Sequence, residues 1–196
     1  MARSKEFNED EALDKAMEVF WKQGYEKTSI QDLVDNMGIH RRSLYDTFGD
    51  KHSLFVQTLE RYESLIAAQI RKQITEEMTT VESIRKIFEI AVYSDNTNPK
   101  GCLMVNTAVE LSLLDNEVSQ RIKFAFKQTE NLIADLLIRG QARGEVARSF
   151  DINELSRYIH NALIGVRVLV KMTADPKEFD STIDMTLSIL KNDHYK

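Results

Sequence analysis

The sequence has a single cysteine and no long apolar run. Because Cys102 is the only cysteine among 196 residues, no disulfide can form within the chain. A chain without disulfides is typical of a reducing compartment, so we expect a cytoplasmic protein. No stretch approaches the roughly 18 consecutive apolar residues of a membrane-spanning helix. Residues 1–11 are polar and carry alternating charges, so we expect neither a signal peptide nor a membrane partner.

The motifs that carry enzyme chemistry are also absent. The four histidines, His40, His52, His160 and His194, are scattered and show no metal-ligand spacing. The chain has no glycine-rich phosphate loop, no nucleophile elbow and no cysteine cluster. We therefore expect no enzyme activity, no metal site and no cofactor.

The sequence lacks the excess of positive charge that is typical of nucleic-acid-binding proteins. The net charge is −5. Residues 1–51 contain eight Lys or Arg and eleven Asp or Glu, so this segment is itself net −3. Any DNA binding must then depend on where a few cations lie, because the total charge repels phosphate.

Apolar residues recur with a helical period along almost the whole chain, and no alternating, strand-like run is present. A loop rich in turn-forming residues is expected at 95–101. The sequence predicts an all-α fold of about nine helices. Their expected positions are 12–24, 28–38, a short third helix that closes at Gly49, 50–77, 80–94, 102–114 as an interior helix, 118–144, 153–172 and 176–190.

The first three predicted helices have the arrangement of a helix-turn-helix. Thr28 and Gln31 form a candidate capping box for the second helix, and Gly38 provides the turn. Leu44 and Phe48 are expected to hold the third helix onto a small core. The face left exposed carries short or cationic groups that can reach base edges and phosphates, namely His40, Arg41, Arg42, Ser43, Asp46 and Thr47.

Residues 28–51 resemble the N-terminal module of the TetR/AcrR family of transcriptional regulators. The resemblance depends on Thr28, Gly38 and the spacing Leu44-Tyr45…Phe48…Lys51-x-x-Leu54, and it covers about residues 9–55. It implies that Thr28 caps the second helix and offers its hydroxyl to a phosphate. It further implies that the third helix enters the major groove and that Lys51 meets the DNA backbone. The implied DNA-binding residues are Thr28, Ser29, His40, Arg41, Arg42, Ser43, Tyr45, Thr47 and Lys51.

Two residues depart from the family pattern. His40 stands where the family usually has a Ser or Thr cap, so a hydroxyl cap is missing unless the imidazole replaces it. Asp46 places an acid on the recognition helix, where it can accept a hydrogen bond from cytosine or brace Arg42 at i, i+4. The operator sequence is therefore not readable from this helix.

The resemblance implies that the remaining helices form a domain that binds a ligand and a second copy of the chain. A lone helix-turn-helix reads few bases, which also favours a homodimer. The candidate interface residues are Leu155, Ile159, Leu163, Val166, Val170, Ile183 and Leu187. The alternative is that these apolar stripes face only their own core.

A pocket for a small-molecule effector is expected among the middle helices. Its candidate residues combine apolar walls with polar anchors: Phe88, Tyr93, Cys102, Met104, Asn106, Glu110, Phe126, Tyr158 and Asn161. The aromatic residues could equally be ordinary core, and Glu110 could have a structural partner. Cys102 opens a helix and is a candidate electrophile or redox sensor, with a small buried apolar residue as the alternative.

The sequence thus predicts a homodimeric, ligand-responsive regulator, most plausibly a repressor that binds a palindromic operator. We assign residues 1–52 to the DNA-binding domain and 53–196 to the effector-binding and dimerisation domain. The competing hypothesis is a helical adaptor that binds only proteins, although an adaptor has no need for Arg41, Arg42 and Lys51 around one small module.

Overall fold

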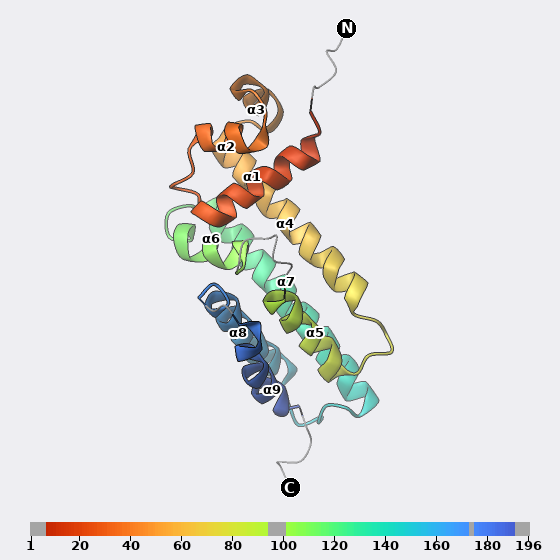
Figure 1. Cartoon of the computed structure of the whole chain (residues 1–196). Coiled ribbons are helices and arrows are strands. Elements are labelled where there is room, and N and C mark those ends of the chain that lie inside the picture. Colours follow the sequence, from red (N-terminus) through yellow and green to blue (C-terminus); the bar gives the residue numbers. More distant parts are fainter. Residues whose placement is uncertain (1–6, 94–100, 173–174, 191–196) are drawn as a thin grey trace.

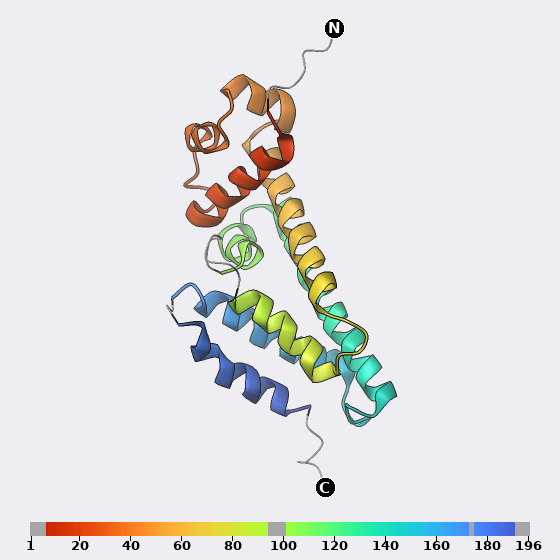
Figure 2. The ribbon, with the colours of Figure 1, turned by 45° about the vertical axis from the view of Figure 1, so that its right-hand side comes forward.

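The computed structural model describes residues 7–93, 101–172 and 175–190. These residues form nine α-helices and one short 3-10 helix and contain no strand, which confirms the all-α prediction. The elements are α1 (Glu9–Gln23), α2 (Ile30–Met37), α3 (Arg41–Phe48), α4 (Lys51–Gln73), α5 (Thr80–Val92), α6 (Leu103–Leu111), α7 (Asn116–Arg143), α8 (Ile152–Leu169), η1 (Pro176–Phe179) and α9 (Asp180–Ser188). Helices α1–α3 gather at one end of an elongated molecule and α8 and α9 lie toward the other, with α4 and α7 running between (Figures 1 and 2).

Local capping signals fix the ends of the first helices. The side chain of Asn8 caps α1, and Gly24 ends it at a φ of 85°. Gly38 ends α2 in the left-handed conformation, with φ 70° and ψ 32°, as the sequence predicts. Asp50 caps α4 by accepting a hydrogen bond from the backbone N–H of Ser53, also as predicted.

The predicted capping box of α2 is wrong by one residue. Ser29 and Asp32 form it, because the Ser29 hydroxyl accepts from the Asp32 N–H while the Asp32 carboxylate accepts from the Ser29 N–H. Thr28 is instead 1% exposed, and its hydroxyl donates to the carbonyl of Gly24 at 2.6 Å. Thr28 therefore closes the turn between α1 and α2 from inside.

One hydrophobic core joins the three-helix module to the helices that follow. It contains buried side chains of α1–α4, of α6 and of the first part of α7. Phe20 packs edge-on against Phe55 with ring centroids 4.9 Å apart, and Trp21 does the same against Tyr62 at 5.0 Å. Packing therefore continues from α1 through α4 to α6 without a break at residue 52.

A second core lies toward the other end of the molecule. It is formed by α5, the second part of α7, α8 and α9. At Gly140 a Cβ atom would lie 2.3 Å from the hydroxyl oxygen of Thr80, so glycine permits the close approach of α5 and α7. Helix α7 contributes to both cores and so holds the two ends of the molecule together.

Several predicted boundaries need correction. Helix α4 ends at Gln73 rather than near residue 77, and the last helix begins as the 3-10 segment Pro176–Phe179. Helix α6 is shorter than predicted and is interior only in part: five of its nine residues are buried, whereas Val109 is exposed, as is Leu113 just beyond the helix. The predicted loop lies outside the described residues except for Gly101. Among the described helices, none is long and apolar enough to cross a membrane.

Candidate DNA-binding surface and effector pocket

Helix α3 presents one polar face and is held by two buried anchors. Leu44 is fully buried, and Phe48 is buried and contacts the ring of Phe7. On the opposite face His40, Arg41, Arg42, Tyr45 and Asp46 are exposed, whereas Ser43 and Thr47 are half-buried. This arrangement leaves the first turn of α3 free to approach a groove of DNA.

The two arginines of α3 have partners on their own helix. The guanidinium of Arg41 lies over the ring of Tyr45, 5.9 Å from its centroid. Arg42 Nε lies 3.5 Å from Asp46 Oδ2, which is the i, i+4 brace that the sequence offered as one role for Asp46. Both Arg42 and Asp46 side chains are exposed, so the ion pair is weak and can exchange for a phosphate or a base.

The N-terminus of α3 carries no side-chain cap. His40 stands at the N-cap position and makes no capping hydrogen bond, and the first turn of α3 has no acid. The missing cap that the sequence predicted is therefore confirmed. The first backbone N–H groups of α3 stay available to an anion, which is favoured there by the helix dipole.

Lys51 is positioned by an aromatic ring. Its Nζ atom lies 4.3 Å from the centroid of the Tyr25 ring, a cation–π contact at the start of α4. Burial, with smaller contributions from nearby acids such as Glu26, raises the pKa of Tyr25 above its ordinary value. Tyr25 is therefore neutral, and its ring holds Lys51 beside α3. Lys51 is the lysine that the family resemblance assigns to the DNA backbone.

Two contacts tie this module to α6 and to the segment that follows it. The carboxylate of Glu110 accepts hydrogen bonds from the backbone N–H groups of Tyr25 at 3.0 Å and Glu26 at 2.9 Å. His52 Nε2 lies 2.8 Å from Asp115 Oδ2. The backbone N–H of Val118 first, and His52 second, hold the pKa of Asp115 below its ordinary value, against the opposing effect of burial. The end of α6 is therefore attached to the loop that carries Tyr25.

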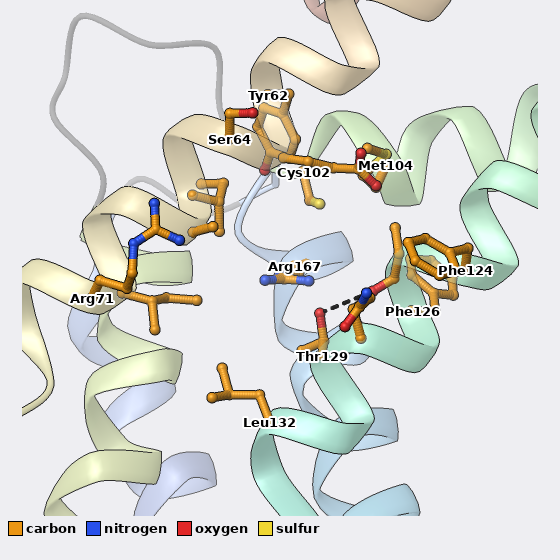
Figure 3. Close-up of a pocket in the computed structure, with 16 residues that line it drawn as sticks. Tyr62, Ser64, Arg71, Cys102, Met104, Phe124, Phe126, Thr129, Leu132 and Arg167 are labelled. Atoms are coloured by element: carbon orange, nitrogen blue, oxygen red, sulfur yellow. Dashed lines mark hydrogen bonds between the residues drawn. The ribbon is translucent and has the colours of Figure 1, made fainter.

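A pocket of about 530 Å³ lies between α4 and α7 (Figure 3). Its mouth is lined by exposed side chains, including Arg71 and Phe124. Its inner end is lined by the buried residues Tyr62, Cys102 and Arg167. The volume falls within the roughly 300–1,000 Å³ of small-molecule sites.

Comparisons with known proteins agree with this geometry. A family model described as bacterial regulatory proteins, tetR family, matches residues 12–58, and one described as tetracyclin repressor-like, C-terminal domain, matches residues 80–186. The HTH-type transcriptional regulator YezE of Bacillus subtilis is 34% identical over 193 residues, which are 97% of this chain and 100% of YezE. This chain belongs to the TetR family of bacterial transcriptional regulators.

A further relative and a solved structure support the same assignment. The HTH-type transcriptional repressor ComR of Escherichia coli is 31% identical over 190 residues, which are 95% of this chain and 90% of ComR. A cysteine mutant of the TetR-family regulator CifR, solved in complex with a 26-bp double-strand operator DNA, has a TM-score of 0.87 and 26% sequence identity. That likeness covers 95% of this chain and 98% of the CifR chain. The family resemblance and the fold expected from it are thereby confirmed.

Three of the residues predicted for the effector site of this TetR-family protein line the pocket: Cys102, Met104 and Phe126. Cys102 is 2% exposed and makes no capping hydrogen bond, so it lies in the wall of the pocket rather than at the surface.

The structure places four other predicted effector residues and Phe88 outside this pocket. Phe88 is fully buried in the second core. The hydroxyl of Tyr93 donates to Asp180, and the side-chain oxygen of Asn106 accepts from Lys171. Tyr158 and Asn161 are exposed on α8.

Glu110 has the structural partner that the sequence left open. Its carboxylate is occupied by the backbone N–H groups of Tyr25 and Glu26 and does not line the pocket. Its interpretation as a ligand anchor is therefore wrong, and its position instead joins α6 to the DNA-binding module.

The predicted interface residues are also corrected. Each of the seven is buried at the second core of a single chain, so none has apolar surface left for a second copy: Leu155, Ile159, Leu163, Val166, Val170, Ile183 and Leu187. The alternative interpretation, that these stripes face their own core, is the one the structure supports. Other apolar side chains on the same helices are exposed, namely Tyr158, Val168 and Leu169 of α8 with Met185 of α9 and the adjoining Ile189.

Sequence reasoning missed Tyr62, Thr129 and Arg167 of the pocket. Arg167 had a readable signal, because it is the only charge in the apolar run 162–170. Tyr62 had none, since an aromatic residue at helical spacing on α4 is typical of any core.

Proposed function

We propose that this TetR-family protein is a homodimeric repressor that binds a palindromic operator and releases it when a small molecule occupies the pocket. The observation that carries the proposal is the exposed, uncapped start of α3 beside Lys51, held in place by buried Leu44 and Phe48. CifR, which is similar over nearly the whole chain, was solved with operator DNA. ComR, a relative over 95% of the chain, is named a repressor.

In this proposal Arg41, Arg42 and Ser43 meet the major groove, because they occupy the first turn of α3. His40, Tyr45, Thr47 and Lys51 meet the DNA backbone. Ser29 keeps its place in the set only by its exposed position, since both its hydroxyl and its backbone N–H are engaged with Asp32. Thr28 is withdrawn from the set, because its buried hydroxyl is already bonded to Gly24.

A dimer follows from the size of the reading surface. One eight-residue helix contacts few base pairs, whereas two copies of α3 about 34 Å apart read two half-sites one helical turn apart. The exposed apolar side chains of α8 and α9 provide a surface for that pairing. Gly165 on α8 is exposed, and a Cβ there would meet nothing within 4 Å, so a partner helix can approach closely.

Helix α6 is the proposed link between pocket and DNA. Its start, at Cys102 and Met104, lines the pocket. Its end, at Glu110, holds the backbone of Tyr25, whose ring contacts Lys51. We infer that a ligand against the first turn of α6 displaces the helix and thereby changes the spacing of the two α3 helices.

The functional division stays at residues 1–52 for DNA binding and 53–196 for effector binding and dimerisation. The first core crosses this division, which supports mechanical coupling between the two parts. Binding of a bacterial operator places the protein in the cytoplasm and assigns it a regulatory role rather than catalysis. The competing adaptor hypothesis has no specific observation in its favour.

A gel shift on the DNA upstream of the protein's own gene tests the proposal. The expected result is a shifted complex whose affinity falls steeply with salt, because Lys and Arg contacts to phosphate release counterions. Arg41→Ala should abolish the shift, while the matched control Arg148→Ala, an exposed arginine beyond α7, should leave it intact. Equal DNA binding by both variants would place the reading face away from Arg41, whereas the absence of any DNA shift at low salt would favour the adaptor.

A further inference from the structure

Arg167 is a buried cation for which the described residues provide no counter-ion. Its side chain projects from α8 into the inner end of the pocket, and the residue is only 8% exposed (Figure 3). Within 7–93, 101–172 and 175–190, no carboxylate lies within ion-pair distance of its guanidinium, and no side chain or carbonyl accepts a hydrogen bond from it. Guanidinium stays protonated in proteins, so Arg167 cannot avoid its charge by losing a proton.

Two partly buried arginines near the same helices, Arg61 and Arg121, are paired with carboxylates. Arg61 forms a two-pronged contact with Asp14 at 2.8 and 3.0 Å. Arg121 reaches Glu60 at 2.8 Å and Glu63 at 2.7 Å. An unpaired charge in the interior is strongly unfavourable, so the contrast marks Arg167 as a site that an anion completes.

The groups around Arg167 do not supply that anion. Among the described residues that line the pocket, Glu63 is the one carboxylate, and it is engaged by Arg121. Burial first, and the charge of Arg167 second, lower the pKa of the nearby His160 to about 4, so this imidazole is neutral at pH 7. The hydroxyl of Tyr62 lies beside the thiol of Cys102, and burial raises the pKa of Tyr62 well above its ordinary value. Tyr62 is therefore neutral and can donate a hydrogen bond to an anion at this end.

The rest of the pocket is suited to an apolar body. Ile66, Ala67 and Ile70 of α4 line one wall, and Phe126 and Leu132 of α7 line another. A volume of about 530 Å³ holds a molecule of drug-like size. Arg167 is the buried cation of the pocket, whereas Arg71 at the mouth is exposed to solvent, so the complementary molecule has an acidic group at the inner end and an apolar remainder.

We propose that the pocket binds an organic carboxylate whose acidic group pairs with Arg167 and accepts from Tyr62, and whose apolar part lies between α4 and α7. This inference rests on the proposed function only in taking the pocket as the effector site. A planar guanidinium binds a carboxylate through two parallel hydrogen bonds, which makes the pair both strong and directional.

Calorimetric titration of the purified protein without DNA tests the proposal. The probes are linear and aromatic carboxylic acids of about six to twelve carbons, each paired with its primary amide, which has the same shape and no charge. We expect at least one acid to bind about tenfold or more tightly than its amide. Arg167→Met should remove that preference, Arg167→Lys should retain part of it, and the control Arg148→Met should keep it in full.

The possible outcomes separate clearly. If no acid binds better than its amide, or if Arg167→Met binds acids as tightly as the unsubstituted protein, the proposal is wrong. A structural role for Arg167 predicts that Arg167→Met melts at lower temperature without ligand, whereas an unpaired charge predicts equal or higher thermal stability. Acid binding that fails to release operator DNA would contradict the proposed function and leave the carboxylate site standing.

Discussion

Substitution of Glu110 tests the contact between α6 and the DNA-binding module. Glu110→Gln keeps the size of the side chain, which matters because the carboxylate lies close to the position a Gly24 Cβ would occupy, at 2.9 Å. Gln retains one carbonyl oxygen, so it can accept from only one of the two N–H groups of Tyr25 and Glu26. The other N–H then faces an amide NH₂ group and loses its partner.

The magnitude follows from the type of bond that is lost. A hydrogen bond to a charged acceptor contributes about 1.5–3 kcal/mol, and the lower end applies because the N–H of Glu26 is exposed and can bind water instead. We expect Glu110→Gln to reduce the free energy of unfolding by about 1–2 kcal/mol. Glu110→Ala, which removes both acceptors, should reduce it by about 2–4 kcal/mol.

Urea denaturation measures the free energy of unfolding, and hydrogen exchange locates the effect. The amides of residues 25 and 26 should exchange faster in both Glu110 variants, while amides in the second core should change only through global stability. Asp135→Asn, an exposed acid of α7, is the matched control and should stay within about 0.5 kcal/mol of the unsubstituted protein. Unchanged exchange at residues 25 and 26 would show that Glu110 does not hold this loop in solution.

The remaining predictions concern the DNA surface, the dimer and pH. Arg42→Ala should weaken operator binding by about 1–3 kcal/mol and reduce the preference for the operator sequence. Lys51→Ala should weaken binding to all DNA sequences alike and lower the slope of log affinity against log salt concentration by about one. An unchanged sequence preference in Arg42→Ala would place the reading face elsewhere. Met185→Asp, on the exposed face of α9, should be a monomer in light scattering and keep its helical content. A stable dimer of this variant would show that the interface lies elsewhere. The pKa of buried His160 is lowered from about 6.5 to about 4, so the free energy of unfolding should fall by up to about 3 kcal/mol as pH decreases from 6.5 to 4. His160→Leu should flatten this pH dependence. Equal pH profiles of the two proteins in urea denaturation would refute the prediction.

The sequence predicts well those features that depend on neighbouring residues. Gly24, Gly38 and Asp50 mark helix ends because a left-handed φ or a capping side chain acts within a few residues. Leu44 and Phe48 are identified as anchors by their spacing on one short helix. The choice between Thr28 and Ser29 fails because each is followed three residues later by a residue suited to a capping box. Only the hydrogen bond that the buried Thr28 hydroxyl donates to the carbonyl of Gly24 decides between them.

Features that depend on contacts across the chain were not readable. Periodicity shows that Leu163 of α8 lies on a buried face, but not whether its own core or a second copy covers it. The bond between Glu110 and Tyr25 joins residues 85 positions apart, and no local pattern encodes it. The same holds for Arg167, whose lone charge is visible in the sequence while its missing counter-ion appears only in three dimensions.

In the proposed dimer, the acidic charge of the DNA-binding module makes the spacing of the two α3 helices decisive. With net −3 over residues 1–51, one module binds phosphate weakly, so affinity depends on both modules engaging at once. Such avidity is lost entirely when geometry forbids the second contact, which means that a small displacement is sufficient for release. Helix α6 has nine residues and is about 13 Å long, short enough to move as a rigid rod between the pocket and the contact of Glu110. Arg167 and Glu110 variants should therefore fail differently: the first should lose acid binding, and the second should bind acid and keep the DNA.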